Sequence, residues 1–326
     1  MDQIRQTQRF SRRVWLGYGA SAIAGASCLL APARAQTPPK TYPLAASSLV
    51  LDVAAAGDAL VAVGDRGFIL RSTDGGQSWA QVSSPTAVML TAVAMSSATN
   101  GVAAGHDATL LRTTDGGQTW TIKDQSPELE APLMDLWFEN ETHGLAIGAY
   151  GLIKETNDGG DTWDERRISE DEPHLYALVR AADGSLFAAG EAGALFRSTD
   201  VGATWAKIES SPYDGTYFGL LSLIDGALLA FGLQGNLFRS PNLGKTWEEI
   251  PTETTASLMG GVQRKDGSID IVGLSGAVLT SIDGKSFQLN NLPDREALSG
   301  VFETAANKMI VFGEHGVHPL DLERQL

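Results

Sequence analysis

The chain has 326 residues, of which 43% are hydrophobic and 36 are glycine, and its one cysteine is Cys28. A single cysteine cannot form an intramolecular disulfide or a multi-thiolate metal site, so both are excluded. The formal net charge of −15 repels phosphate backbones, so we do not expect nucleic acid as a partner.

The first 35 residues have the organisation of an export signal. A basic stretch, RFSRRVWLG, precedes the small and apolar run Tyr18–Leu30, and Ala33-Arg34-Ala35 forms an A-x-A cleavage site before Gln36. The apolar run is too short to span a bilayer. Ser11–Leu16 (SRRVWL) resembles the twin-arginine signal of proteins that are exported already folded. We therefore expect residues 1–35 to be an export signal and residues 36–326 to be a periplasmic domain.

An alternative interpretation makes Cys28 a lipid anchor, but Gly25 stands where such signals have a large aliphatic residue. Cleavage before Gln36 would remove five arginines and one aspartate, leaving 19 basic and 38 acidic residues and a net charge of −19. This charge disfavours docking onto anionic lipid. No later segment is apolar enough to span a bilayer.

A unit of about 42 residues recurs seven times, which is the length of a propeller blade. Each unit reads as four short strands; in the second unit these cover residues 90–96, 101–106, 109–114 and 119–124. No later stretch has a convincing helical period. We predict an all-β, seven-bladed β-propeller of four-stranded blades. The units align on the glycines Gly64, Gly105, Gly148, Gly190, Gly232, Gly273 and Gly313.

The two ends of the chain predict how the ring closes. The first unit begins with an inner strand over residues 47–54, whereas the seventh stops one strand short. We expect residues 41–46 to form the missing outer strand by pairing with residues 318–322. Pro43 is acceptable there, because an edge strand can spare one N–H.

The sequence STDGGQSW (residues 72–79) predicts a hairpin between the third and fourth strands. The Asp74 carboxylate can accept backbone N–H groups of its own turn, Gly75 and Gly76 allow positive φ, and we expect the Trp79 ring to be buried between blades. We interpret these Asp-boxes as structural, because one carboxylate cannot be the catalyst in every blade. The aligned residues are Asp74/Trp79, Asp115/Trp120, Asp158/Trp163, Asp200/Trp205, Asn242/Trp247 and Asp283/Phe287.

The stretch VAVGDRGFILRSTDGGQSW (residues 61–79) and its copies resemble the photosystem II stability/assembly factor family over roughly residues 47–326. The Asp-box alone also occurs in sialidases, other glycoside hydrolases and sortilin-type receptors. The resemblance implies a seven-bladed propeller of the thylakoid lumen or bacterial periplasm, with no cofactor and no enzyme activity. It also implies a monomeric scaffold that binds a protein subunit of a membrane complex during assembly. Many such sequences occur in bacteria without photosynthesis, so the photosystem need not be the partner.

Photosynthetic members of that family carry an arginine-rich patch, which suggests a second set of partner-binding candidates. Here the strand before the Asp-box carries an arginine in four copies, whereas Glu155 and Thr280 replace it in two others. The competing hypothesis is that each arginine covers an aromatic ring or pairs with a carboxylate. The four arginines are Arg71, Arg112, Arg197 and Arg239.

The Gly-x-x-Gly turns between the second and third strands give the first set of candidates. Uniform glycines with variable tips are typical of a recognition surface on a rigid scaffold, although the tips can equally be ordinary soluble turn residues. We expect the connections 123–133 and 164–174 to lie on the same face. Tyr213 and Tyr217 could anchor a peptide or sugar, or pack in the core. The candidates are Asp65, Arg66, His106, Asp107, Tyr150, Glu191, Gln234, Glu314 and His315.

An Asp-box glycan-binding protein or sialidase-like glycoside hydrolase is the alternative. Such hydrolases use two carboxylates across a cleft, and Asp65, Asp107, Glu191 and Glu314 could face one another. The arginine-led motif that opens the sialidase fold is absent. We expect no metal site, because His106, His143, His174, His315 and His318 lie in different copies or loops. A periplasmic accessory of an envelope transporter is a further alternative.

Overall fold

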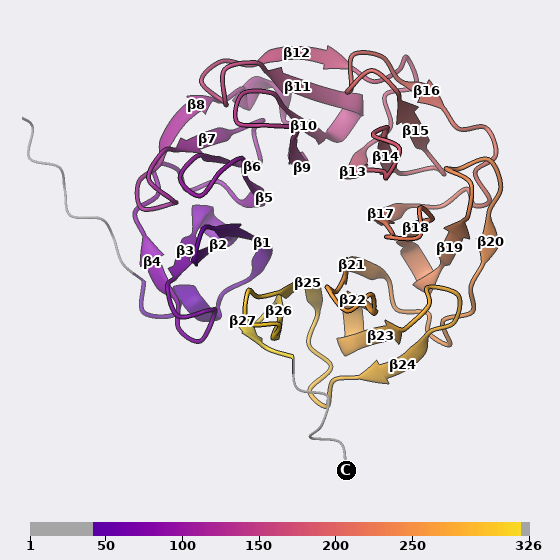
Figure 1. Ribbon diagram of the computed structural model, residues 1–326. Coiled ribbons are helices and arrows are strands. Elements are labelled where there is room, and N and C mark those ends of the chain that lie inside the picture. The colour runs from indigo at the N-terminus through magenta and orange to yellow at the C-terminus, as the bar shows by residue number, and fades with distance from the viewer. Residues whose placement is uncertain (1–41, 321–326) are drawn as a thin grey trace, which may run out of the picture. The chain divides into compact units, whose positions relative to one another are not determined.

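The computed structural model describes residues 42–320. The predicted export signal, Cys28, Thr41 and the residues after Leu320 lie outside this range. Seven antiparallel sheets surround a central opening in chain order, as the blades of a propeller (Figure 1). The predicted all-β propeller with seven blades is therefore confirmed. Within residues 42–320, no helix is long and apolar enough to cross a membrane.

Every blade begins at the central opening and continues outward, strand by strand. The innermost strands are β1 (Val50–Ala56), β5 (Leu90–Met95), β9 (Leu133–Phe138), β13 (Leu175–Arg180), β17 (Tyr217–Ser222), β21 (Leu258–Gln263) and β25 (Leu298–Glu303). The second strands are β2 (Ala59–Gly64), β6 (Gly101–Gly105), β10 (Gly144–Gly148), β14 (Leu186–Gly190), β18 (Leu228–Gly232), β22 (Ile269–Gly273) and β26 (Met309–Gly313).

The third strands are β3 (Ile69–Ser72), β7 (Leu110–Thr113), β11 (Leu152–Thr156), β15 (Leu195–Ser198), β19 (Leu237–Ser240), β23 (Ala277–Ser281) and β27 (Gly316–Pro319). The outer strands are β4 (Ala80–Val82), β8 (Thr121–Asp124), β12 (Asp164–Arg167), β16 (Ala206–Lys207), β20 (Glu248–Glu249) and β24 (Gln288–Asn291). Short 3-10 helices complete the chain: η1 (Ala45–Ser47), η2 (Asp65–Gly67), η3 (Pro127–Leu129), η4 (Ala149–Gly151), η5 (Leu233–Gly235) and η6 (Leu274–Gly276).

The second strands are apolar on both faces because blades pack against them from both sides. All six residues of β2 and all five of β10 are buried. The outer strands are polar and mostly exposed, as in β8 and β12. Each gap between neighbouring blades contains its own apolar cluster; between the third and fourth blades, Leu145 and Ile147 pack with Leu175, Leu186 and Phe196. Burying both faces of each small sheet makes the ring stable where a single blade would not be.

The last blade also packs against the first, so the ring is closed. Val50 and Leu60 of the first blade share a cluster with Ile310 and Phe312 of the last. However, the last sheet has three described strands, β25, β26 and β27. The predicted strand over residues 41–46 is not seen: Tyr42–Ser47 form a turn and the helix η1 instead.

The helix η1 nevertheless lies beside the last blade. Ala45 is buried in the cluster that joins the first and last blades. A Cβ atom added to Gly316 on β27 would lie 2.0 Å from the carbonyl oxygen of Ala46, so the two backbones are in close contact. On the other side, the Tyr42 ring packs on Phe68 of the first blade at 5.3 Å between centroids. Helical backbone in this segment leaves no extended strand for β27 to pair with.

Candidate functional site

The Gly-x-x-Gly turns and the connections between blades occupy one face of the ring, which we call the turn face. A Cβ atom on Gly67 would lie 2.4 Å from the carbonyl oxygen of Thr86, and one on Gly193 would lie 2.2 Å from that of Tyr213. Gly151 donates its N–H to Pro173 at 2.8 Å. Each turn is therefore seated directly on the connection that leads to the next blade.

Most of these turns share a backbone conformation at the tip. The second tip residue has a left-handed φ of 52° at Arg66, 56° at Tyr150, 51° at Ala192, 59° at Gln234 and 58° at Ser275. This conformation costs a non-glycine residue about 1 kcal/mol or more, and packing must maintain it. The turn face thus presents a fixed row of backbones with different side chains.

The candidate tip residues differ in their exposure and partners. Arg66 is exposed and pairs with Asp65 at 3.2 Å between Nε and Oδ2. Tyr150 is 46% exposed, and its ring packs edge-on against His174 at 4.7 Å. His106 and Gln234 are exposed. These side chains can contact a partner without a rearrangement of the fold.

The acidic tip residues are held within their own blades. Glu191 Oε1 accepts the N–H of His174 at 2.9 Å, and Glu314 Oε2 accepts that of Ala297 at 3.1 Å. Asp107 is partly buried, and its carbonyl accepts the N–H of Ser126 at 2.8 Å. Within residues 42–320, no hydrogen bond or ion pair joins two of the carboxylates proposed as an acid–base pair.

Of the two tyrosines, Tyr217 belongs to the core. It is fully buried, and its hydroxyl lies 3.1 Å from Ser211 Oγ. Its ring packs edge-on against Phe238, and Tyr213, which is partly buried, stacks on the same phenylalanine at 5.8 Å. Core packing therefore explains Tyr217 without a ligand.

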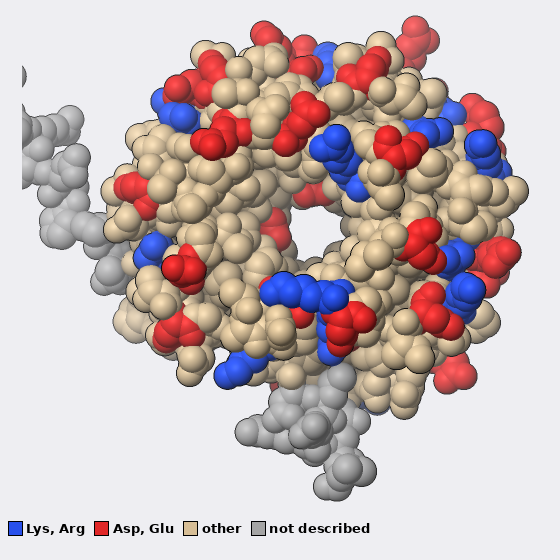
Figure 2. Space-filling view, in the orientation of Figure 1, with Lys and Arg blue, Asp and Glu red and all other residues tan. Residues whose placement is uncertain are grey.

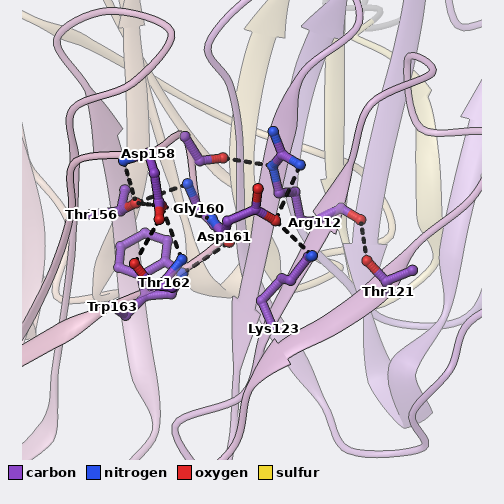
Figure 3. Close-up of polar contacts among 10 residues, drawn as sticks. Arg112, Thr121, Lys123, Thr156, Asp158, Gly160, Asp161, Thr162 and Trp163 are labelled. Atoms are coloured by element: carbon purple, nitrogen blue, oxygen red, sulfur yellow. Dashed lines mark hydrogen bonds and ion pairs between the residues drawn. The ribbon is translucent and has the colours of Figure 1, made fainter.

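The opposite face carries the Asp-boxes, and each carboxylate is saturated with local donors. In the third copy, Asp158 Oδ1 accepts the N–H groups of Asp161 and Thr162 at 3.0 and 2.9 Å (Figure 3). The hydroxyls of Thr162 and Thr156 donate to the same carboxylate at 2.6 and 2.9 Å. Together these hydrogen bonds, above all that of the Thr162 hydroxyl, lower the pKa of Asp158 to about 2. An ionised, fully occupied carboxylate suits a structural role and not that of a catalytic acid.

The aromatic residue that ends each Asp-box packs between its own blade and the preceding one. Trp163 joins the cluster between the second and third blades, and its indole N–H donates to the carbonyl of Gly160 at 3.3 Å. The aromatic ring thus fixes the hairpin against the neighbouring blade. Among these rings, however, Trp120 alone is buried as expected. The rings that are only partly buried, contrary to the prediction, are those of Trp79, Trp163, Trp205, Trp247 and Phe287.

Trp205 and Trp247 differ further from the other copies in their hydrogen bonding. Trp205 packs in the cluster between the third and fourth blades, and Trp247 packs in the cluster between the fourth and fifth. In the described part of the chain, neither indole N–H has a hydrogen-bond partner. The carbonyl groups at the equivalent positions, those of Gly202 and Gly244, accept other donors, so apolar contact alone fixes these two rings. The donors are Arg166 at 2.5 Å for Gly202 and the hydroxyl of Ser210 at 2.6 Å for Gly244.

The arginines before the Asp-boxes also make contacts within the chain. Arg112 donates from Nε to the carbonyl of Gly159, in the next Asp-box, at 2.8 Å. It shares Asp161 with Lys123, at 3.3 and 2.6 Å (Figure 3). Arg71 repeats the first contact with the carbonyl of Gly116 at 2.9 Å. These arginines link successive blades.

Two further arginines pair with carboxylates of their own blades: Arg197 with Asp183 at 2.6 Å and Arg239 with Asp225 at 2.5 Å. These contacts agree with the hypothesis of carboxylate pairing. Within residues 42–320, one of the four arginines also covers a ring: the guanidinium of Arg197 lies 5.6 Å from the centre of Phe187.

The third copy shows why its arginine could be replaced. Glu155 stands at that position, and Arg166 on the neighbouring strand β12 pairs with it at 2.8 Å. The same guanidinium makes the contact with Gly202 in the next Asp-box. The link to the next blade is therefore kept, with the guanidinium supplied from a different strand.

The central opening contains two carboxylates that the sequence analysis did not select. Asp52 and Asp135 line a cavity of about 270 Å³ together with Met134, Tyr176 and Phe218. Burial raises the pKa of Asp52 to about 7. Burial and, second, the charge of Asp52 raise the pKa of Asp135 to about 7. An aspartate within an otherwise apolar inner strand, as in LVLDVA and LMDLWF, was the available signal.

Both aspartates have structural partners. Asp52 accepts the N–H groups of Val53 and Val93, and Asp135 accepts those of Leu136 and Leu178. Each carboxylate therefore links its inner strand to the next blade. Figure 2 shows the opening surrounded by interspersed acidic and basic side chains.

Comparison with solved structures gives neighbours of the same fold. A structure described as YCF48 bound to D1 peptide has a TM-score of 0.71 and 19% identity, covering 88% of this chain and 100% of its own. YCF48 from Cyanidioschyzon merolae has a TM-score of 0.66 and 18% identity, covering 84% and 96%. A streptogramin B lyase has a TM-score of 0.71 and 13% identity, covering 83% and 93%. At these identities the likeness shows the fold alone.

Comparison with curated proteins gives no match. A family model does match, over residues 31–129 and 123–280, and it is described as photosynthesis system II assembly factor YCF48. The matched residues extend over six of the seven blades and cover well over half of the chain. On this match, the chain belongs to the family of the photosystem II assembly factor YCF48.

Proposed function

We propose that this protein is an exported, non-enzymatic scaffold that binds a protein subunit of a membrane complex and assists its assembly or stability. The observation that carries the proposal is the family match, together with the D1 peptide bound by a structurally similar YCF48. Whether the partner here is a photosystem subunit depends on the host.

We place the partner on the turn face. Its tips combine a fixed backbone with exposed and diverse side chains, including Arg66, Tyr150 and Gln234. On the Asp-box face, by contrast, the carboxylates and Arg71 and Arg112 are occupied by contacts within the chain. Tyrosine and arginine are the side chains that most often dominate binding energy at protein interfaces.

The proposal is tested by capture from native membranes. The triple variant Arg66→Ala/Tyr150→Ala/Gln234→Ala should lose co-purifying membrane-complex subunits. A matched triple variant on the opposite face, Asp58→Ala/Lys245→Ala/Lys285→Ala, should keep them. All six side chains are exposed, so both variants should fold. Equal capture by the two variants would contradict the placement.

Capture from membranes and two assays on the purified protein separate the alternative functions. Capture of transporter subunits alone would favour an accessory of an envelope transporter. Hydrolysis of a sialoside or β-glucan panel by the purified protein would favour a glycoside hydrolase. Binding of such glycans without hydrolysis would favour a lectin.

Export is part of the proposal, and it rests on the pattern of residues 1–35. We expect the protein in the periplasmic fraction, with Gln36 at its N-terminus. Replacing Arg12 and Arg13 with lysine should retain the precursor in the cytoplasm, because the twin-arginine pair is read by the export receptor. A mature protein that begins at a lipid-modified Cys28 would contradict the cleavage site.

A further inference from the structure

Four titratable side chains converge where the last blade meets the turn face. Asp294 and Glu296 lie on the connection between β24 and β25, His315 lies in the turn between β26 and β27, and His318 lies on β27. Single ligand atoms of Asp294, Glu296 and His315 all lie within 4.8 Å of one another. The histidines come from one strand pair and the carboxylates from the preceding connection, so the fold brings them together.

Glu296 is the centre of this cluster. Its side chain is 1% exposed, and its Oε2 lies 3.0 Å from Nδ1 of His315. Its other oxygen, Oε1, is in contact with Nε2 of His318. The Nδ1 atom of His318 lies 3.2 Å from the carbonyl oxygen of Pro319. His318 therefore holds Glu296 through Oε1, the oxygen that does not face His315.

Two further carboxylates lie near His315, on the side of Glu296 that His318 does not contact. Asp294 adds a second carboxylate beside that of Glu296. Glu314 adds a third, 3.9 Å from Nε2 of His315. The His315 ring can offer a lone pair at Nδ1 when it is neutral. A buried carboxylate, an exposed carboxylate and an imidazole therefore surround one point with an excess of negative charge.

We propose that Asp294, Glu296 and His315 bind a divalent transition-metal ion, for which Zn²⁺ is the probe. Zinc takes histidine nitrogen and carboxylate oxygen ligands at about 2.0–2.2 Å, so two ligands of one ion lie roughly 3 Å apart. Nδ1 of His315 and Oε2 of Glu296 have this separation. An imidazole ligand favours zinc over magnesium or calcium. His318 orients Glu296 through the oxygen that does not face the ion.

Such an ion would connect two parts of the blade that has three described strands. The carboxylates belong to the connection that enters β25, and His315 precedes the edge strand β27. Metal binding to the folded state alone raises the stability of that state. We therefore expect Zn²⁺ to stabilise the ring at the last blade.

The test measures Zn²⁺ binding by isothermal titration calorimetry on the EDTA-treated, tag-free protein. We expect one saturable site, a Zn²⁺-dependent rise in melting temperature, and no rise with Mg²⁺. His315→Ala and Glu296→Gln should each weaken binding at least tenfold. His174→Ala is the matched control, because His174 also lies beside a carboxylate on the turn face, 4.0 Å from Glu191, and it should leave binding unchanged.

His315 is 57% exposed at its side chain, so His315→Ala should keep the melting temperature of the metal-free protein. This variant keeps the test decisive even if Glu296→Gln fails to fold. Absence of saturable Zn²⁺ binding, or equal affinity in wild type and His315→Ala, would overturn the proposal. Because the purified protein is used alone, the result does not depend on which partner the turn face binds.

Discussion

The carboxylate of Asp52 on β1 accepts the backbone N–H of Val93 on β5 at 2.8 Å, which links the inner strands of the first two blades. Asp135 and Leu178 repeat this link between the third and fourth blades at 2.7 Å. Between the second and third blades, Thr91 Oγ1 donates to the carbonyl of Leu133 at 2.5 Å instead. Side-chain hydrogen bonds at the central opening therefore hold successive inner strands together. Two of these bonds are made by titratable carboxylates, those of Asp52 and Asp135.

These two links predict a pH-dependent stability. The pKa of each aspartate is raised from 3.8 to about 7 in the folded protein, so folding favours the protonated form. Their contribution is fully present below pH 3.8 and is lost as the pH rises through about 7. We expect the melting temperature to fall by about 5 °C between pH 6 and pH 8. Differential scanning calorimetry across this range measures it.

Asp52→Asn tests the origin of that slope. The variant should be less stable at pH 6, because the amide group turns a donor toward a backbone N–H, but its melting temperature should change less between pH 6 and pH 8. Asp58→Asn, an exposed position in the following turn, is the control and should keep the wild-type slope. Equal slopes in all three proteins would show that other groups cause the pH dependence.

The glycine that aligns the seven copies predicts a steric effect. Gly148 has an extended backbone, with φ of −170°, so its conformation suits any residue. A Cβ atom there would lie 2.2 Å from the carbonyl oxygen of Pro132, however. Gly148→Ala should therefore destabilise the protein by about 1–3 kcal/mol, as overpacking typically does. Urea denaturation measures the change.

Gly75→Ala is the matched control for the steric explanation. Gly75 has a positive φ of 74° and no atom within 4 Å of an added Cβ, so only backbone strain opposes the substitution. We expect a cost of about 1 kcal/mol. A larger loss at Gly75 than at Gly148 would contradict the close approach as the reason for the repeated glycine.

The arginine link between blades predicts a loss of stability without a loss of partner binding. Arg112→Ala removes the hydrogen bond to Gly159 and the pairing with Asp161. We expect destabilisation of about 1–2 kcal/mol by urea denaturation. Arg112→Lys should recover only part of it, because lysine lacks the Nε–H and planar fork. Loss of membrane-complex capture in a still-folded Arg112→Ala protein would instead assign this arginine to the interface.

The N-terminal helix predicts that residues before the first blade stabilise the ring. Ala45 is 2% exposed and packs with Ile310 and Phe312 of the last blade. Replacing Ala45 with aspartate should lower the melting temperature by several degrees, because an unpaired charge would be buried. Replacing the 72% exposed Leu44 with aspartate should not. Equal melting temperatures would mean that η1 does not contribute to ring closure.

Much of this fold could be predicted from local sequence, because each blade repeats the same short-range signals. The Asp-box at Asp158 and the fully buried strand at Gly144–Gly148 follow from residues close in the chain. Long-range features were harder to predict. A strand over residues 41–46 was expected from strand counting alone, and no local pattern indicated that Ala45 would begin a short helix packed against the last blade.

The site was less predictable for the same reason. Asp52 and Asp135 lie in strands whose apolar pattern hides them, and only the ring brings both to the hub. Glu296 was missed because its two histidine partners lie 19 and 22 positions later in the chain. Residues whose roles depend on which strands become neighbours carry no local signature.

The most direct measurement of the central claim is site-specific photo-cross-linking in the native host. A photoreactive benzoylphenylalanine is placed at Tyr150 on the turn face and, in a second protein, at Lys285 on the Asp-box face; both positions are exposed. The account predicts that the probe at position 150 alone forms an adduct with a membrane-complex subunit, identified by mass spectrometry. Adducts from position 285 with none from position 150, or no protein adduct from either, would contradict it.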